Sequence, residues 1–433
     1  MKNLLLIERI YMENRFFKFD ERLNDAAQKA LEKAKGAFSR IDEMTEYNQH
    51  KVLSAFIENR VSETQLWGST GYGYGDSGRE LADKIVADVF GAEDAIIRYS
   101  IACGTHALGI ALFSLLRPGD NMLCITGRPY DTICPVIGMD GKNGQGSLAD
   151  FGVTYLQTDL DENGHLDYEA IEKAVKENKI RLVYLQRSRG YTLRDSLSVE
   201  EIGKAIKIVK ENSDALVMVD NCYGEFVEKT EPTAVGADLI VGSLIKNPGG
   251  GVAKCGGYMA GTKEAIELCS YRLTTPSLGK EVGASLESIR EILMGLFHAP
   301  HVVGEALKTA VFAASLFEGF GFETTPSSDE TRHDIIQAIK LKNSENLIAF
   351  CQGLQKGSPV DSYVTPEPWD MPGYPCQVIM AAGAFTSGSS IELSADAPLR
   401  EPFAVWMQGG LNFHSGKIGI MLAAQEMIKR KLI

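Results

Sequence analysis

The sequence predicts an α/β protein in which a mostly parallel seven-stranded sheet is wrapped by helices and followed by a smaller α+β unit. From residue 95 onward, short β-branched runs alternate with helical stretches or loops, a pattern typical of parallel strands joined by crossovers. Two of these runs, ALVMV at 215–219 and DLIVG at 238–242, read as continuous apolar segments, which indicates strands buried on both faces. After about residue 300 the alternation ends, and this change predicts a second, smaller domain.

The N-terminal part is predicted to be helical. Residues 20–58 carry apolar positions at helical spacing, and we expect two helices there, split between Arg40 and Thr45. A loop rich in glycine and tyrosine follows at 67–80, and a helix is expected from about 79 to 90. The expected strands are the runs at 95–100, 121–127, 152–158, 181–186, 215–221, 238–244 and 256–261.

The C-terminal part begins with a strong amphipathic helix at 302–322, which ends at a pair of glycines. A proline-rich loop at 365–376 precedes two expected strands at 377–385 and 389–396, and a helix at 415–433 closes the chain. We therefore divide the chain into an N-terminal helical segment at 1–60, a large cofactor-binding domain at 61–298 and a small α+β domain at 299–433.

Composition excludes several classes of partner. The 433 residues include 44 Lys and Arg against 57 Asp and Glu, and the net charge of −13 argues against non-specific binding to nucleic acid or to an anionic membrane. Eight cysteines without CxxC spacing predict neither a metal site nor a disulfide framework. The apolar start is interrupted by Glu8 and Arg9, and no run of 18 apolar residues follows, so we expect a cytoplasmic protein that binds small molecules.

The segments that follow predicted strands are the places to look for chemistry, because open α/β sheets bind ligands at the carboxyl ends of their strands. After the strand at 95–100, the run ACGTHAL puts Gly104 and Thr105 at the start of a helix. Free backbone N–H groups at a helix start form an anion site suited to a phosphate. A plain strand-to-helix turn would have the same sequence.

Two further strand exits carry charged residues. DNCYGEF places Asp220 directly after one strand, although a cap or a turn residue explains an aspartate there equally well. GSLIKNPGGG places Ser243 and Lys246 after the next strand, and such a lysine alone is more often a surface residue. Together the three exits supply what pyridoxal phosphate requires: an amine for a Schiff base, a carboxylate for the pyridine nitrogen and a phosphate cradle.

The motifs VDNCYGEF, GSLIKNPGGG, ACGTHAL and GYGYGDSGR resemble the fold-type I pyridoxal-phosphate enzymes of cysteine and methionine metabolism. The resemblance is closer to the branch called methionine gamma-lyase-like, or aluminium resistance protein, and runs from about residue 20 to the end. It implies that Lys246 is the Schiff-base lysine and that Asp220 faces the pyridine nitrogen. It further implies that Ser243, Gly104 and Thr105 bind the phosphate.

The same resemblance implies roles for aromatic residues and for a second subunit. Tyr130 in GRPYDT falls where the family has an aromatic that stacks on the cofactor ring, with a tyrosine packed under a turn as the alternative. In such enzymes a Tyr and an Arg of the neighbouring subunit reach the phosphate, and Tyr72 or Tyr74 and Arg79 are the candidates, in a spelling that departs from the usual Tyr-Ser-Arg. We therefore expect a homodimer or homotetramer with shared active sites.

An amino-acid substrate needs its carboxylate fixed, and a guanidinium does this with two parallel hydrogen bonds. The resemblance places that arginine in the small domain, where Arg400 is the first candidate and Arg332 the second. Arg187 and Arg189 in LQRSRGY follow another strand and are candidates for phosphate or substrate contacts. A solvated arginine or a salt-bridged loop is the alternative for each.

The resemblance implies a lyase that breaks the carbon–sulfur bond of a sulfur-containing amino acid and releases a 2-oxo acid, ammonia and a thiol. We expect the freed Lys246 to act as general base at the α-carbon, with a pKa lowered by burial and by a cationic partner. An aminotransferase, racemase or aldolase would need the same residues, and a non-catalytic regulatory protein that binds pyridoxal phosphate or amino acids is a further alternative. Nucleotide-binding loops are disfavoured because no GxxxxGK[ST] or strand-coupled GxGxxG is present.

Overall fold

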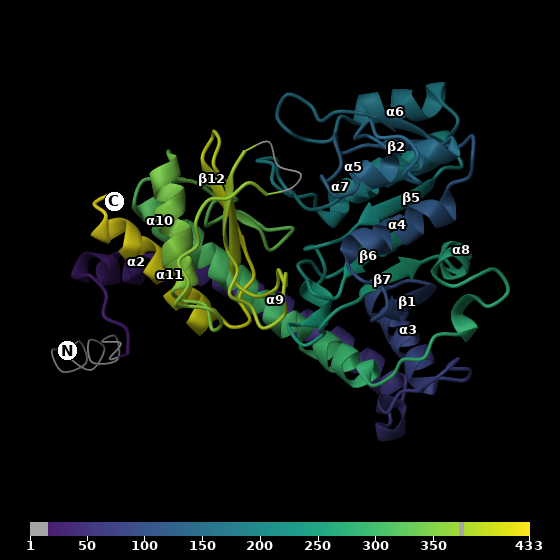
Figure 1. Cartoon of the computed structure of the whole chain (residues 1–433), viewed down its shortest axis with the longest axis horizontal. Helices are drawn as coiled ribbons and strands as arrows, with labels where there is room; N and C mark the ends of the chain where they lie inside the picture. Colours follow the sequence, from purple (N-terminus) through teal and green to yellow (C-terminus); the bar gives the residue numbers. More distant parts are fainter. Residues whose placement is uncertain (1–15, 372–375) are drawn as a thin grey trace.

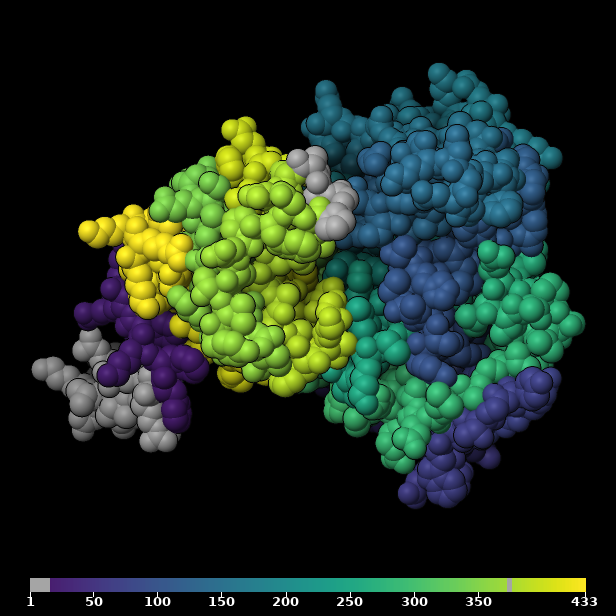
Figure 2. Space-filling model, viewed as in Figure 1, coloured from purple at the N-terminus to yellow at the C-terminus, as the bar shows by residue number. Residues whose placement is uncertain are grey.

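The computed structural model describes residues 16–371 and 376–433 (Figure 1). The start of the chain at 1–15 and the stretch 372–375 of the proline-rich loop lie outside the described residues, and so do the expectations for them. Two bodies lie side by side, and the long helices α2 (Glu21–Glu58) and α9 (Ser288–Gly319) run from one to the other. The space-filling view shows a narrow furrow between the two bodies (Figure 2).

The larger body is built on a seven-stranded sheet with the strand order β1-β7-β6-β5-β4-β2-β3. The strands β3, β2, β4, β5 and β6 pair in parallel, and β7 runs antiparallel to both β6 and β1. The predicted mostly parallel seven-stranded sheet is therefore confirmed. The strands are β1 (Asp94–Arg98), β2 (Asn121–Cys124), β3 (Thr154–Gln157), β4 (Ile180–Gln186), β5 (Leu216–Asp220), β6 (Leu239–Ser243) and β7 (Gly257–Gly261).

Both faces of the middle of this sheet are covered, which explains why β5 and β6 are continuous apolar runs. Successive side chains alternate between the faces, so that on β5 Met218 and Val219 belong to different apolar clusters. Three helices pack on the face of Met218, and three others, together with parts of α2 and α9, contribute to the cluster on the face of Val219. The first three are α4 (Gly104–Leu115), α5 (Cys134–Ile137) and α8 (Lys263–Leu273); the others are α3 (Ser77–Phe90), α6 (Tyr168–Glu177) and α7 (Val199–Asn212).

The smaller body contains an antiparallel sheet of five strands in the order β10-β11-β12-β9-β8. Its two helices pack on one face, while the other face presents Trp406 and its neighbours to the larger body. The expected strands at 377–385 and 389–396 are shorter than predicted, because a loop occupies most of the stretch between them. The elements are β8 (Glu323–Thr325), β9 (Gln337–Lys340), α10 (Ser344–Gln355), β10 (Val378–Ala381), β11 (Ser394–Pro398), β12 (Ala404–Gln408) and α11 (Phe413–Lys429).

Helix α2 is one continuous helix, so the expected split between Arg40 and Thr45 is wrong. The segment contains no proline, and α9 packs along it so closely that a side chain at Gly304 would collide with Thr45. Helix α9 runs without interruption through residues 298 and 299, so the two bodies share it. Over the described ranges, no helix is both long enough and apolar enough to cross a membrane.

Candidate active site

Lys246 lies at the exit of β6, where the glycines that follow it turn the chain inward. A side chain at Gly249 would collide with the carbonyl of Leu244, and Gly250 has a φ of 54° and lies against the backbone of Gly295 in α9. Only glycine allows both the left-handed conformation and this close approach. The loop therefore packs under α9, and Lys246 is half-buried, with its Nζ 3.8 Å from the centroid of the Tyr223 ring.

Asp220 is the last residue of β5, the strand next to β6 in the sheet. It is 6% exposed, and its carboxylate accepts hydrogen bonds from the backbone N–H of Cys222 at 3.1 Å and from the hydroxyl of Tyr184 at 3.4 Å. Burial raises the pKa of Asp220, while the charge of Lys246 opposes that rise. The structure thus brings the predicted lysine and aspartate into one buried environment.

The pKa of Lys246 moves in the direction opposite to the expectation from sequence. Burial by itself would lower the pKa of Lys246, but Cys222, Tyr223 and Asp220 outweigh that effect and raise it above its ordinary value. The cationic partner expected from the sequence is not among the groups that shift the pKa of Lys246, whereas the carboxylate of Asp220 is. Because the buried thiol of Cys222 is neutral, the carboxylate of Asp220 is the group that favours the ammonium form of Lys246 in the chain without cofactor.

A cradle for an anion lies between α4 and β6. Gly104 is the first residue of α4, and the residue before it, Cys103, provides no side-chain cap for the first N–H groups of the helix. Ser243 is 1% exposed, and its hydroxyl has no hydrogen-bond partner among the described residues. A buried hydroxyl without a partner is costly unless a ligand completes it. Thr105 stands beside this cradle and shares a hydrogen bond of 2.7 Å with Thr132.

These features fit pyridoxal phosphate. The unpartnered hydroxyl of Ser243 and the uncapped N-terminus of α4 are donors for a phosphate. Ser243 and Lys246 stand at the exit of β6, and Asp220 stands at the exit of the adjacent strand β5. A single ligand that carries a phosphate, an aldehyde and a basic ring nitrogen would use all four groups.

Tyr130 belongs to an aromatic wall that reaches the smaller body. Its backbone N–H donates to the side chain of Gln186 at 2.9 Å, and its ring centroid lies 5.9 Å from that of Tyr191. The hydroxyl of Tyr191 donates to Asp396 at 2.9 Å, and the Tyr191 ring meets Trp406 edge-on at 5.8 Å. Tyr130 is also among the groups that act electrostatically on Lys246, which places it at the same site.

The glycine-rich loop exposes its tyrosines and buries its arginine. Tyr72 and Tyr74 are 75% and 62% exposed and stack on each other with centroids 5.7 Å apart. Arg79 is 1% exposed and donates to the carbonyls of Gly73 at 2.9 Å and Gly283 at 2.8 Å. Within one chain the guanidinium holds the loop, and the predicted contact of Arg79 with the phosphate of a neighbouring subunit stays a prediction.

Arg187 is also not available to a substrate. Its side chain is fully buried and donates to Asn221 at 2.8 Å, to Glu231 at 3.2 Å and to Glu228 at 2.8 Å. The predicted contact with phosphate or substrate is wrong for this residue, since two carboxylates and an amide occupy its N–H groups.

The other predicted arginines do not meet at Lys246. Arg189 is 1% exposed and donates to the carbonyl of Thr325 at 3.0 Å, so it joins the two bodies. Arg332 is buried and donates to Gln337 at 2.5 Å, and burial lowers its pKa to about 10. Arg400 is exposed in the turn between β11 and β12, where its guanidinium has no partner among the residues described.

Sequence reasoning passed over two residues of the site, Tyr223 and Cys222. Both belong to the motif DNCYGEF, and the signal that could have found them is their position directly after the strand-ending aspartate. Cys222 is 5% exposed, and its sulfur would lie 3.6 Å from a Cβ atom on Gly104, so it lines the cradle. Burial raises the pKa of this thiol well above its ordinary value, so it is neutral.

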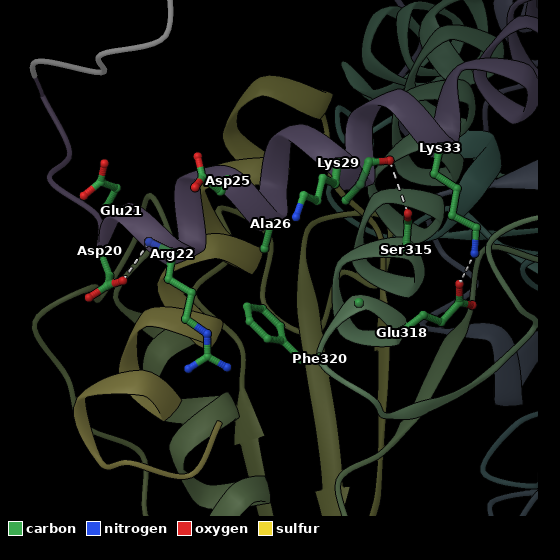
Figure 3. Close-up of a pocket in the computed structure, with 12 residues that line it drawn as sticks. Asp20, Glu21, Arg22, Asp25, Ala26, Lys29, Lys33, Ser315, Glu318 and Phe320 are labelled. Carbon is green, nitrogen blue, oxygen red and sulfur yellow. Dashed lines mark hydrogen bonds and ion pairs between the residues drawn. The ribbon is translucent and has the colours of Figure 1, made fainter.

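A separate hollow of about 880 Å³ lies between the start of α2 and the end of α9 (Figure 3). Its wall mixes acidic and basic side chains, and an ion pair of 2.8 Å joins Lys33 to Glu318 across it. None of the predicted site residues lines this hollow. The candidate active site is therefore identified by the residues around Lys246 and not by this hollow.

Comparison with known proteins agrees with this geometry. The fold is that of the fold-type I pyridoxal-phosphate enzymes. The crystal structure of YhfS from Escherichia coli, a pyridoxal-5'-phosphate dependent protein, matches this chain with a TM-score of 0.62 at 15% identity. The match covers 90% of this chain and 97% of that one. The chain belongs to the methionine gamma-lyase family, whose model matches residues 23–428. The resemblance inferred from the motifs is thereby confirmed.

Closer relatives cover nearly the whole chain. The crystal structure of a carbon-sulfur lyase involved in aluminum resistance from Clostridium novyi NT matches with a TM-score of 0.91 and 50% identity, over 94% of this chain and 96% of that one. The uncharacterized protein YnbB of Bacillus subtilis is 49% identical over 399 residues, which are 92% of this chain and 94% of the relative.

Proposed function

We propose that this protein is a cytoplasmic, pyridoxal-phosphate-dependent lyase that cleaves the carbon–sulfur bond of a sulfur-containing amino acid and releases a 2-oxo acid, ammonia and a thiol. The observation that carries the proposal is the meeting of Lys246, Asp220 and the unpartnered hydroxyl of Ser243 at two adjacent strand exits. Membership of the methionine gamma-lyase family and similarity to a protein described as a carbon-sulfur lyase support the reaction class.

Each residue of the site has a task in this proposal. When bound, pyridoxal phosphate supplies an aldehyde that captures amines and a ring that accepts electrons from the α-carbon. Lys246 would hold the cofactor covalently, and its amine, when free, would take the proton from the α-carbon. Asp220 holds a proton on the ring nitrogen, and its burial strengthens that interaction because water does not screen it. Ser243 and the start of α4 hold the phosphate.

The site also needs a way to orient the substrate. Tyr130 and Tyr191 form a rigid aromatic wall between the larger body and Asp396 of the smaller one, which limits the positions a substrate can take. Arg400, exposed in the small domain, remains the predicted partner of the substrate carboxylate. In this proposal it approaches the crevice when the two bodies close on a bound amino acid.

A second copy of the chain completes the proposed site. Tyr72 and Tyr74 stand exposed beside other large apolar residues, and the backbone of Gly283 donates to the carbonyl of Tyr72 at 2.9 Å, which ties their loop to the start of α9. Exposed apolar groups clustered in this way mark an interface. The neighbouring exposed residues are Trp67, on the same loop, and Leu286, whose backbone N–H donates to the carbonyl of Ser69 at 3.0 Å.

The shared site has its own test. A mixture of Lys246→Ala and Tyr72→Ala/Tyr74→Ala chains, unfolded and refolded together, should regain part of the wild-type turnover if each site takes tyrosines from the partner. Hybrid dimers would contain one intact site, whereas separately refolded variants would contain none. Sedimentation of the wild-type chain as a monomer would contradict this part of the proposal.

The covalent assignment is tested by replacing Lys246 with alanine. After incubation with pyridoxal phosphate and reduction with borohydride, mass spectrometry should find the cofactor on the peptide that contains Lys246 in the wild type and nowhere in Lys246→Ala. Lys254→Ala is the matched control, because Lys254 lies on the same loop but is exposed and pairs with Glu291. Cofactor attached elsewhere in the wild type would refute the proposal.

The reaction type is tested by product analysis. Oxo-acid release from sulfur amino acids should not depend on an added oxo-acid acceptor, whereas an aminotransferase requires one. A protein that binds the cofactor and amino acids without converting them would be the regulatory alternative.

A further inference from the structure

The ring of Tyr223 is in direct contact with the amine of Lys246. The Nζ atom lies 3.8 Å from the ring centroid, well inside the distance of about 6 Å at which an aromatic face attracts a cation. Both the amine and the ring are half-buried, so water weakens this attraction only in part. The ring face therefore stabilises the ammonium form of Lys246.

The backbone of Tyr223 is strained, and the surrounding structure maintains the strain. Tyr223 has a φ of 72°, a left-handed conformation that side chains rarely adopt. The turn is closed by a hydrogen bond of 2.9 Å from the N–H of Gly224 to the carbonyl of Asn221. A side chain at Gly224 would come within 2.5 Å of Arg187, so the buried guanidinium fills the space directly under the turn. Arg187 thus supports the conformation that points the ring at Lys246.

Tyr223 also takes part in the contact between the two bodies. Tyr223 packs against a cluster in the sheet of the smaller body that contains Trp406, Ile336 and Ala404. The position of the ring is therefore set by its own left-handed turn and by its packing against the small domain. A residue held so firmly is suited to define the position of a flexible lysine.

We propose that Tyr223 is a positioning residue for Lys246, whose ring face holds the amine in place and stabilises its ammonium form, both in the cofactor-free chain and after the freed amine has taken a proton. The inference rests on the proposed function of Lys246. In the lyase reaction, the amine takes a proton from the α-carbon and becomes an ammonium over the ring. It then gives this proton to the departing sulfur, which leaves as a neutral thiol and returns the amine to its neutral form.

The test measures the pKa of Lys246 in the full-length chain freed of cofactor, by competitive labelling of lysines with acetic anhydride followed by mass spectrometry of the peptide. Three replacements are compared: Tyr223→Phe, which keeps the ring face; Tyr223→Leu, which removes it; and Tyr223→Phe with a pentafluorinated ring, which keeps the shape and reverses the charge distribution of the face. We expect Tyr223→Phe to match the wild type, and the other two to lower the pKa of Lys246 by about one unit, a tenfold change in the protonation equilibrium.

The three variants distinguish an effect of the ring face from an effect of the hydroxyl. An unchanged pKa of Lys246 in Tyr223→Leu would overturn the proposal. A pKa in Tyr223→Phe as low as in Tyr223→Leu would overturn it too, because the hydroxyl and not the ring face would then be the group that acts on Lys246. If Tyr223→Leu does not fold, the comparison of the plain and the pentafluorinated ring decides. The labelling does not require cofactor, so failure of pyridoxal phosphate to attach to Lys246 would refute the proposed function without affecting this result.

Discussion

Gly104 and Ser243 approach so closely that a Cβ atom on Gly104 would lie 3.3 Å from the Cβ atom of Ser243. The two residues come from different elements, the start of α4 and the end of β6. Their contact sets the buried hydroxyl of Ser243 beside the uncapped N–H groups of the helix, and both are donors for the same anion. A wider residue at 104 would separate the two halves of this cradle.

Replacing Ser243 with alanine should therefore weaken cofactor binding without weakening the fold. The lost hydrogen bond to a charged phosphate is worth about 1.5 to 3 kcal/mol, which corresponds to roughly a 10- to 100-fold lower affinity for pyridoxal phosphate. The melting temperature of the cofactor-free chain should stay the same or rise, because a buried hydroxyl without a partner is removed.

A titration with pyridoxal phosphate and a thermal melt check the two effects. Ser114→Ala is the matched control, since Ser114 is also buried, in the helix α4 whose first residue contacts Ser243, but donates to the carbonyl of Ile110. It should lower the melting temperature and leave the affinity for the cofactor unchanged. A stable Ser243→Ala chain with wild-type affinity would show that the phosphate lies elsewhere.

Replacing Asp220 with asparagine should separate cofactor attachment from turnover. The amide still accepts the N–H of Cys222, so the strand exit keeps its shape. Loss of the carboxylate removes one of the groups that raise the pKa of Lys246, so attachment of pyridoxal phosphate at neutral pH should become faster. Turnover should fall by about 100-fold or more, because the proton on the ring nitrogen is no longer held. Stopped-flow absorbance and oxo-acid assays measure the two rates, and an unchanged turnover would exclude the role of Asp220.

The sequence predicts the sheet and the core of the site for the same physical reason. Strands buried on both faces must be apolar throughout, so β4, β5 and β6 can be recognised in the sequence as apolar runs. Because these strands are parallel, the residues that follow them lie at one edge of the sheet. Asp220, Ser243 and Lys246 follow directly from that rule. The small-domain sheet was less visible because β8 has only three residues, too few to show a period of two.

What the sequence did not predict depends on partners that are distant along the chain. Arg187 and Arg79 follow promising motifs, yet one is paired with Glu231 and the other with carbonyls that include that of Gly283. The direction of the Lys246 pKa depends in the same way on which charge the fold sets beside the amine. Local spacing contains no information about these contacts.

Removing the guanidinium of Arg187 should destabilise the chain strongly. Arg187→Met keeps much of the apolar volume but leaves the carboxylate of Glu231, which is 1% exposed, without its charge partner. Breaking a buried ion pair from one side costs about 3 to 5 kcal/mol in the free energy of unfolding. Arg290→Met is the control, because Arg290 is exposed on α9 and its removal should change the stability by less than about 0.5 kcal/mol. Urea unfolding measures both, and equal stabilities would make Arg187 a candidate for substrate contact again.

Glu225 makes the stability of the protein depend on pH in a direction opposite to that of most carboxylates. It is fully buried, and one carboxylate oxygen accepts from the hydroxyl of Tyr258 at 2.9 Å while the other has no partner among the described residues. Burial raises its pKa to about 8, with a further rise from Glu231 that Tyr258 and Lys246 oppose. Between pH 4.5, the ordinary pKa of the group, and pH 8, the folded chain therefore keeps a proton that the unfolded chain has released.

The free energy of unfolding of the wild type should consequently fall as pH rises across this interval, relative to that of Glu225→Gln, in which position 225 does not titrate. One pKa unit corresponds to about 1.36 kcal/mol, so the difference between the two proteins should shift in favour of the variant by up to roughly 4 kcal/mol by pH 8. Urea unfolding of both chains at intervals of pH gives this difference directly. The comparison cancels the titration of Glu231, Tyr258 and Lys246, which both chains contain, so parallel stability curves would mean that Glu225 is ionised in the folded protein.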